Sequence, residues 1–274
     1  MTIEVSLTWE GALPLLLNKL SEEDFMVLRG PLESGRQSPG SLSGVLVLSL
    51  FLQPIMFFVT YVVAADSTMF PNKDIMFTIH LWITAIIMLI SIIYAIPTVY
   101  RKSQKIQYLI SIVVSQNLFG VFLYLSALFL IGGEGEVSEK SLLNFTYVTL
   151  LFGLLIFIAT SIRFYILLHK GHYRKGSKKD ELRERFETKS HLPMVIIGST
   201  GLVYIIQFLV RTLEIDDFNM MIVIVLGPLL FFTMIFVLPE QLVILYCKFR
   251  FDSFNYSEKG KLKPFNKHQK GAKK

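Results

Sequence analysis

Long apolar runs, separated by short polar connections, dominate the chain from residue 42 to residue 247. Six of these runs reach or exceed the ~20 residues that an α-helix needs to cross ~30 Å of hydrocarbon. They predict membrane-spanning helices at Leu42–Ala65, Met76–Tyr100, Ile106–Ile131, Leu142–Leu168, Leu192–Leu213 and Asn219–Cys247. The predicted fold class is therefore all-α, a polytopic transmembrane helical bundle.

The polar connections alternate in their content of Lys and Arg. The connections Arg101–Lys105 and His169–His191 and the segment after residue 247 are rich in these residues, whereas the other connections hold one Lys each at most. Short basic connections stay on the cytoplasmic side of a membrane. The pattern predicts that both termini are cytoplasmic and that the chain is a multi-pass protein of the cell membrane.

Residues 1–41 are predicted to form a cytoplasmic segment and linker before the first span. We expect two short amphipathic helices in it, Ser6–Lys19 and Glu22–Arg29, on the inner membrane surface or on the inner connections. Ser21 is a suitable N-cap for the second helix, because acidic residues follow it in the first turn. A stretch rich in Gly, Ser and Pro then leads to the first span.

Composition and charge agree with this organisation. Apolar residues make up 53% of the chain and charged residues 18%, against about 45–50% and about 25% in soluble domains. The net charge of +6 gathers in blocks that flank the spans, so topology explains it, and anionic lipids of the inner leaflet are the expected partner rather than nucleic acid. Residues 248–274, after the transmembrane domain at 42–247, are expected to be a mobile basic tail.

The sequence offers little sign of enzyme chemistry. The single cysteine, Cys247, excludes an intramolecular disulfide. Metal-binding Cys/His spacings, phosphate-binding and dinucleotide-binding glycine motifs, GxSxG and HExxH are all missing from the sequence. We therefore expect no metal, no cofactor and no enzyme of those classes, and a membrane enzyme of another kind is the least favoured reading.

Polar side chains inside the predicted spans need partners, because an unpaired polar group in hydrocarbon is costly. Near mid-depth lie Gln53, next to Pro54 in the first span, and the adjacent Gln116 and Asn117 in the third. One interpretation is interhelical hydrogen bonding, including a bond to the carbonyl that Pro54 leaves free. The other is a polar substrate path, which is less favoured since amides supply neither charge nor proton transfer.

Two charged residues lie at matching depth inside the spans, Arg163 in the fourth and Glu240 in the sixth. Each precedes a basic flank by roughly 10–12 Å at ~1.5 Å per residue. One hypothesis is a buried ion pair that joins the two spans, and the other is a Glu240 carboxylate that takes up a proton or cation during transport. Pro239 and the Gly227-Pro228 pair predict two kinks in the sixth span.

Three further polar residues lie near the predicted outer ends of spans. Arg211 is expected to reach the acidic rim around Glu214, and Gln207, one turn further in, is expected to share its network. His80 in the second span is expected to be a hydrogen-bonded structural group rather than a ligand.

The six-span layout resembles that of small Gram-positive membrane proteins of about this size, including those that protect a cell against a secreted membrane-active toxin. The resemblance covers the arrangement of spans alone and assigns no functional residue. It implies a non-enzymatic accessory protein that acts through a membrane protein or toxin partner. The alternative is a small-solute or ion transporter that uses Glu240, because broken helices near polar residues often mark transport sites.

Overall fold

The computed structural model describes residues 17–133, 137–181 and 218–265. Within these ranges the chain forms helices joined by short connections, together with one isolated β-bridge between Tyr256 and Leu262. Its helices that are long and apolar enough to cross a membrane are Pro39–Ala64, Lys73–Ala95, Gln104–Gly133, Glu139–His169 and Ile222–Arg250. The helical fold class is confirmed for the described residues, and the length and composition of these helices fit a membrane protein. The predicted span Leu192–Leu213 lies outside the described residues, so the count of six and the cytoplasmic termini remain predictions.

The first spanning helix, α3 (Pro39–Phe58), has a well-defined start. The Ser38 hydroxyl accepts a hydrogen bond from the backbone N–H three residues later at 3.2 Å, and Pro39 occupies the first turn, where a missing N–H costs no bond. Pro54 lies inside the helix without ending it. After Phe58 the chain continues as a π-helical segment, η2 (Val59–Ala64).

The second spanning helix, α4 (Lys73–Ala95), ends earlier than the sequence predicts. Ile96 has φ −73° and ψ 126°, outside the helical region, because a following proline disfavours helical geometry in the residue before it. Pro97 then begins a separate turn, α5 (Pro97–Tyr100). The predicted span Met76–Tyr100 is therefore wrong at its C-terminal end.

The third span is a continuous rod at the centre of the bundle. It consists of α6 (Gln104–Ser115), the π-helical segment η3 (Gln116–Val121) and α7 (Phe122–Gly133). In its most apolar stretch 67% of the residues are buried, against 22% or less in the other spanning helices. It contacts α3, α4, α8 (Glu139–His169) and α11 (Phe218–Arg250). We refer to Gln104–Gly133 as the central helix.

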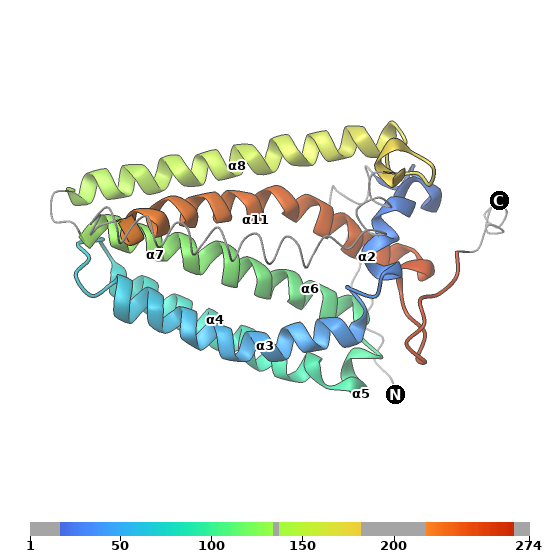
Figure 1. Ribbon diagram of the computed structural model, residues 1–274, viewed down its shortest axis with the longest axis horizontal. Coiled ribbons are helices and arrows are strands. Elements are labelled where there is room, and N and C mark those ends of the chain that lie inside the picture. The colour runs from blue at the N-terminus through green and yellow to red at the C-terminus, as the bar shows by residue number, and fades with distance from the viewer. Residues whose placement is uncertain (1–16, 134–136, 182–217, 266–274) are drawn as a thin grey trace, which may run out of the picture.

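Both α8 and α11 run from the same end of the bundle to the end where α2 lies (Figure 1). α11 approaches the central helix very closely at Gly227. A Cβ atom built on Gly227 would lie 2.5 Å from the Leu123 carbonyl oxygen and 2.6 Å from the Ala127 Cβ. Only glycine therefore permits this contact between α11 and α7 without a shift of the helices.

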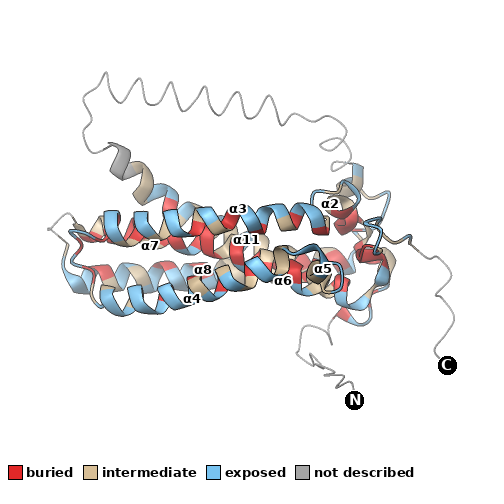
Figure 2. Cartoon of the chain, turned by 90° about the horizontal axis from the view of Figure 1, so that it is seen from below, coloured by how far each residue is buried: buried red, intermediate tan, exposed pale blue. Residues whose placement is uncertain are grey.

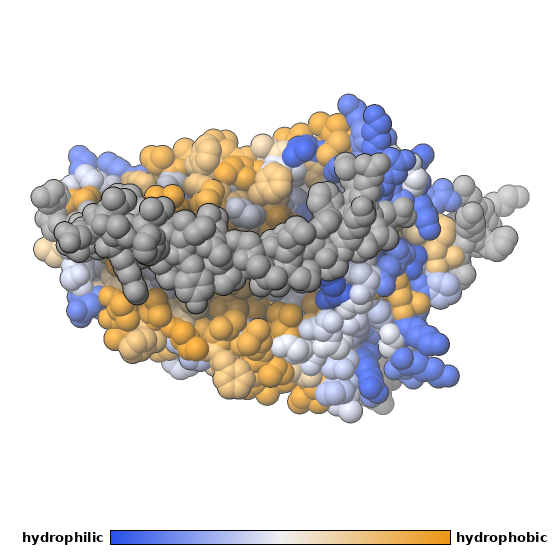
Figure 3. Space-filling view, in the orientation of Figure 1, coloured by the Kyte–Doolittle hydropathy of each residue, from blue (hydrophilic) through white to orange (hydrophobic). Residues whose placement is uncertain are grey.

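The outer surfaces of the spans are apolar, as a lipid environment requires. Large side chains such as Leu48, Phe51 and Trp82 are 56–66% exposed. Buried residues lie along the faces that the helices turn toward one another (Figure 2), and apolar side chains fill a broad band between hydrophilic ends (Figure 3). This combination is that of a multi-pass integral membrane protein.

Three segments that are distant in the sequence fold together at one end of the bundle. They are residues 17–33, which include the 3-10 helix η1 (Glu22–Arg29) and the short α2 (Gly30–Glu33), the connection 170–181, and the C-terminal segment 251–265. We call this assembly the basic-end cap, because the Lys- and Arg-rich connections lie there (Figure 1).

The cap has an apolar interior of its own. Phe25, Leu28 and Phe254 are fully buried in it, and the cluster extends to Leu168 at the end of α8. The N-terminal helix predicted at Glu22–Arg29 is thus present, as a 3-10 helix, and it contacts the connection 170–181. The helix predicted at Ser6–Lys19 lies almost entirely outside the described residues.

The C-terminal segment differs from the mobile tail that the sequence predicts. Residues 251–265 contain the 3-10 helix η4 (Asp252–Phe254) and the turn closed by the Tyr256–Leu262 bridge. Tyr256 is 6% exposed and its hydroxyl donates a hydrogen bond to the Leu32 carbonyl. The physical reason is that the polar tail carries aromatic residues which the cap buries.

Candidate functional site

A chain of hydrogen-bonded polar side chains crosses the interior of the bundle. The Tyr61 hydroxyl lies 3.0 Å from His80 Nδ1, and His80 Nε2 lies 2.9 Å from Asn117 Oδ1. Asn117 Nδ2 then donates to Gln53 Oε1 at 3.3 Å. Gln53, His80 and Asn117 are all buried, with 0%, 6% and 5% of their surface exposed. We call these four residues the intramembrane polar chain.

Irregular helix geometry positions this chain. Tyr61 lies in η2 and Asn117 in η3, and a π-helical turn inserts a residue that re-aims the side chains around it. Gln53 precedes Pro54 on α3, and His80 faces the interior from α4. The sequence predicted interhelical hydrogen bonds for the mid-depth amides, without pairing Gln53 with Asn117, and it predicted His80 as a hydrogen-bonded structural group. It missed Tyr61, although a phenol within an apolar run signals the need for a partner.

The polar chain accommodates either protonation state of His80. When Nε2 carries the ring proton and donates to Asn117, Nδ1 accepts from the Tyr61 hydroxyl. When both ring nitrogens are protonated, Tyr61 can accept from Nδ1 and turn its own proton toward the Met76 carbonyl, 3.3 Å away.

A cavity of about 290 Å³ reaches Tyr61 from the end of the bundle opposite the cap, and Asp66 also lines it.

Gln116 and the adjacent Asn117 bond to different helices. Gln116 Nε2 donates to the Met234 carbonyl at 3.0 Å and lies 3.5 Å from Gln241 Oε1, both on α11. Met234 lies five residues before Pro239, which is inside α11, so the amide bonds to α11 and not to the carbonyl that Pro54 leaves free on α3. Successive residues of η3 thus tie the central helix to α11 on one side and to α3 and α4 on the other.

Arg163 and Glu240 do not form the predicted ion pair. They line one cavity of about 210 Å³ between α8 and α11, together with Tyr173 and Lys179 of the cap. Arg163 is exposed and Glu240 is half-buried, and no ion pair joins these two described residues. Residue counting predicted a matching depth, and both residues do line one cavity, but counting does not give the direction in which each side chain points.

The predicted outer residues Gln207 and Arg211 lie outside the described residues. In the ranges that the structure covers, no group of three or more His, Cys, Asp or Glu side chains is placed to hold a metal ion.

A larger cavity of about 800 Å³ lies at the start of the central helix, and we call it the basic cavity. Arg101, Lys102 and Lys105 line one side of it, and residues of the C-terminal segment line the other, including Tyr256 and Lys263. The sequence marked the connection Arg101–Lys105 as a topology signal and not as part of a site.

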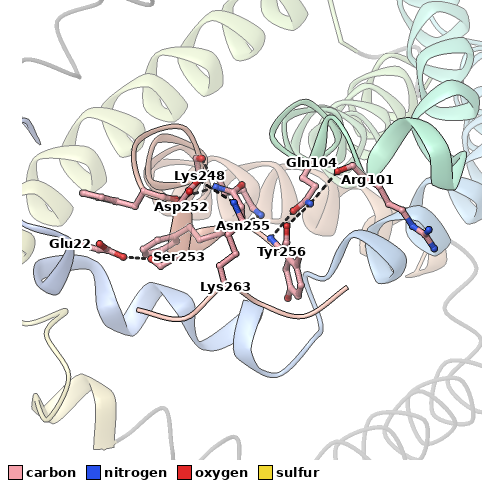
Figure 4. Close-up of polar contacts among 11 residues, drawn as sticks. Glu22, Arg101, Gln104, Lys248, Asp252, Ser253, Asn255, Tyr256 and Lys263 are labelled. Atoms are coloured by element: carbon pink, nitrogen blue, oxygen red, sulfur yellow. Dashed lines mark hydrogen bonds and ion pairs between the residues drawn. The ribbon is translucent and has the colours of Figure 1, made fainter. Parts of the chain in front are cut away.

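The Gln104 amide and the Tyr256 backbone fix the wall of the basic cavity (Figure 4). Gln104 Nε2 donates to the Tyr256 carbonyl at 2.9 Å, and the Tyr256 N–H donates to Gln104 Oε1 at 2.8 Å. Asn255 Nδ2 also donates to the Lys248 carbonyl at 2.8 Å. The Arg101 guanidinium points away from the Gln104–Tyr256 pair and meets no other labelled side chain in Figure 4.

A buried lysine anchors the C-terminal segment beneath this wall. Lys248 is 1% exposed, and its ammonium donates to the Phe254 carbonyl at 3.1 Å. The ammonium also lies 5.3 Å from the centroid of the Tyr108 ring and 5.9 Å from that of Tyr256. The carbonyl and the two ring faces stabilise a positive charge that has left water.

Hydrogen bonds and an ion pair hold the N-terminal part of the cap. Arg174 Nε donates to Asp24 Oδ1 at 2.6 Å, and the Ser21 N–H donates to the other Asp24 oxygen at 2.8 Å. Burial alone would raise the pKa of Asp24, but the hydrogen bonds from Arg174 and Ser21 together hold that pKa below its ordinary value. Burial raises the pKa of Tyr256, against an opposing effect of Arg29.

Comparison with known proteins adds no relative to this description. No family model, no curated protein and no solved structure matches the chain. The resemblance to toxin-protection proteins therefore stays an expectation from the layout of the spans, and the candidate sites are defined by their own geometry.

Proposed function

We propose that the protein is a non-enzymatic accessory protein of the cell membrane that acts through its basic-end cap on a membrane protein or toxin partner. The main support for this proposal is that the cap is a folded structure with its own apolar core. Connections between packed helices need only a few residues, and the described connection at the other end, 65–72, is of that kind. At the basic end, by contrast, three distant segments build a small hydrophobic core with defined hydrogen bonds.

A rigid surface of this kind favours recognition over passive linkage of helices. Binding to a preformed surface avoids the entropy cost of ordering loops. Arg250, at the end of α11, donates to the Leu17 and Asn18 carbonyls at 2.8 and 2.9 Å, so the N-terminal segment is held against the last helix. The cap therefore presents its side chains in fixed positions.

The proposed orientation places the cap in the cytoplasm, as the excess of Lys and Arg at that end favours. Since α8 ends at the cap and α11 begins at the opposite end (Figure 1), the chain between them connects the two ends of the bundle. This supports the proposal of six crossings with both termini on the cytoplasmic side.

Photo-crosslinking in cells tests the proposal. A photoreactive residue at the exposed Lys175 of the cap is expected to give a discrete protein adduct, whereas one at Leu151, which is 58% exposed on the lipid-facing side of α8, is expected to give none. Phe254→Ala, which empties the cap core, should abolish the adduct, and Lys261→Ala on the exposed turn should preserve it. No adduct at Lys175, or equal adducts at both positions, would contradict the proposal.

The toxin-protection version has a separate test. Cells that produce the full chain should survive a secreted membrane-active peptide that kills cells without it, and Phe254→Ala should remove that protection while Lys261→Ala keeps it. Survival that never exceeds that of control cells for any peptide of a panel would exclude this version.

A small-solute or ion transporter is the second candidate, favoured by the cavity that Arg163 and Glu240 line beside Pro239. Uptake into vesicles that contain the purified protein would then fall strongly for Glu240→Gln, while Glu258→Gln, an exposed acid of the C-terminal turn, would match the unmodified protein. Vesicles that take up no ion or solute above background would exclude transport.

A further inference from the structure

The charge around the basic cavity is unbalanced. Arg101, Lys102 and Lys105 lie within five residues of one another and line the same space. None of the three forms an ion pair with any residue that the structure describes. The fourth cation, Lys263, is paired with Asp252 at 3.3 Å, and the other acid of the lining is Glu258.

Apolar side chains stand beside these cations. Ile106, in the first turn of the central helix, is 36% exposed, and Phe249, near the end of α11, is 46% exposed. Both line the basic cavity, and the Lys105 ammonium lies 5.3 Å from the centroid of the Phe249 ring. The cavity therefore combines positive charge with an apolar wall at the point where the spans leave the hydrocarbon.

We propose that the basic cavity binds the phosphate headgroup of an anionic phospholipid, with Arg101 and Lys102 on the phosphate and Ile106 and Phe249 beside the first carbons of the acyl chains. This site goes beyond the partner-binding role proposed for the cap and does not depend on it. Guanidinium groups bind phosphate oxygens through two parallel N–H donors, and lysine adds a point charge.

The size and stiffness of the cavity suit such a ligand. A volume of about 800 Å³ falls within the ~300–1,000 Å³ of small-molecule sites. The two hydrogen bonds between Gln104 and the Tyr256 backbone hold the far wall in place without using any of the cations. Basic pockets at the cytoplasmic edge of membrane helices are suited to anionic headgroups.

The apolar wall distinguishes a lipid from free phosphate as the source of the anion. A soluble phosphate would gain nothing from Ile106 and Phe249, which would stay in contact with water. A phospholipid keeps its acyl chains in the bilayer while its phosphate enters the cavity, so only the headgroup has to be ordered on binding.

Native mass spectrometry of the purified full chain in a neutral detergent tests the proposal, with phosphatidylglycerol as the probe. The double variant Arg101→Gln/Lys102→Gln is expected to weaken phosphatidylglycerol binding at least about tenfold. The control Lys175→Gln/Lys178→Gln removes the same charge from exposed positions outside the cavity and should weaken binding less than about threefold. Equal losses in the two variants would show a general surface potential and overturn the site.

Two further arms identify the source of the anion. Phosphatidylcholine should bind far more weakly than phosphatidylglycerol, and neither glycerol 3-phosphate nor inorganic phosphate should displace the bound lipid. Displacement by either soluble anion, or equal binding of phosphatidylcholine, would overturn the lipid assignment. Gln104→Ala, which keeps every charge and removes the wall contact, should weaken binding several-fold, and circular dichroism of each variant checks that its helices remain folded.

Discussion

The Gln104 side chain and the Tyr256 backbone exchange two hydrogen bonds, as two paired peptide groups would, across 152 residues of sequence. Through them the first turn of the central helix holds the C-terminal segment. Gln104→Ala would leave the Tyr256 N–H and carbonyl without these partners and is expected to cost about 1–3 kcal/mol of local stability. Hydrogen exchange of residues 251–265 should accelerate accordingly. The neighbouring Ser103→Ala should leave that exchange unchanged, because Ser103 precedes the helix without a side-chain hydrogen bond to its first turn.

The Asp24–Arg174 pair gives the cap a defined pH dependence. Because the folded-state pKa of Asp24 is lowered, its carboxylate stabilises the cap fully above the unfolded pKa of about 3.9, and this contribution is lost as the pH falls from there through the lowered value. Asp24→Asn should cost about 1–2 kcal/mol at neutral pH and remove this acid sensitivity. Hydrogen exchange of η1 across pH 5 to about 2 measures both effects.

A matched variant separates this pair from the general effect of acid. Asp252 is 87% exposed and its pair with Lys263 is open to water, so Asp252→Asn should change cap opening by less than about 0.5 kcal/mol. Equal effects of the two substitutions would contradict the assignment to Asp24.

The intramembrane polar chain is expected to contribute modest coupling. A double-mutant cycle of His80→Ala and Asn117→Ala should give a coupling of about 0.6 kcal/mol, and at most about 1.7 kcal/mol. Unfolding of the purified protein by increasing dodecyl sulfate measures it. The free-energy losses of Gln116→Ala and His80→Ala should be additive, because Gln116 bonds to α11 and not to His80. Strong coupling between these two substitutions would contradict the assignment of Gln116 and Asn117 to different helices.

The approach of α11 to the central helix depends on one missing side chain. Gly227→Ala would place a methyl group 2.5 Å from a backbone oxygen and should destabilise the bundle by about 1–3 kcal/mol. Gly44→Ala on α3 is the control, since a Cβ there meets no atom within 4 Å. The same dodecyl sulfate titration should show a loss for the first variant and none for the second.

The lengths of the apolar runs predict the spanning helices well because hydrocarbon forces every backbone group into a helix. Local chemistry could also have predicted the break before Pro97, since its steric effect acts on the preceding residue alone. The π-helical segments η2 and η3 could not be predicted in this way, because they depend on which helices face one another and not on local preference.

In the candidate sites, too, position along a helix could be predicted from the sequence, whereas the choice of facing partner could not. Depth along a span follows from residue counting, so Gln53 and Asn117, which the structure joins by a hydrogen bond, were predicted at a common depth but not as a pair. Direction around a helix does not, which is why Arg163 and Glu240 share a cavity without pairing. The contact of Glu22–Arg29 with a basic connection was predicted, and the Asp24–Arg174 pair is one such contact. The C-terminal part of the cap was missed because the many lysines of residues 248–274 indicated a mobile tail, whereas the few aromatic residues Phe254 and Tyr256 are buried and fold it.

Gln116 and Asn117 are neighbours in the sequence, but their amides bond to different helices. Gln116 bonds to α11, and Asn117 bonds to α3 and α4. Rotation of the central helix about its axis by even one position would break both sets of bonds together and would aim each amide at an apolar surface. The two amides thus fix the rotation of the central helix relative to α3, α4 and α11. A rearrangement that keeps these hydrogen bonds moves the central helix, α3, α4 and α11 together.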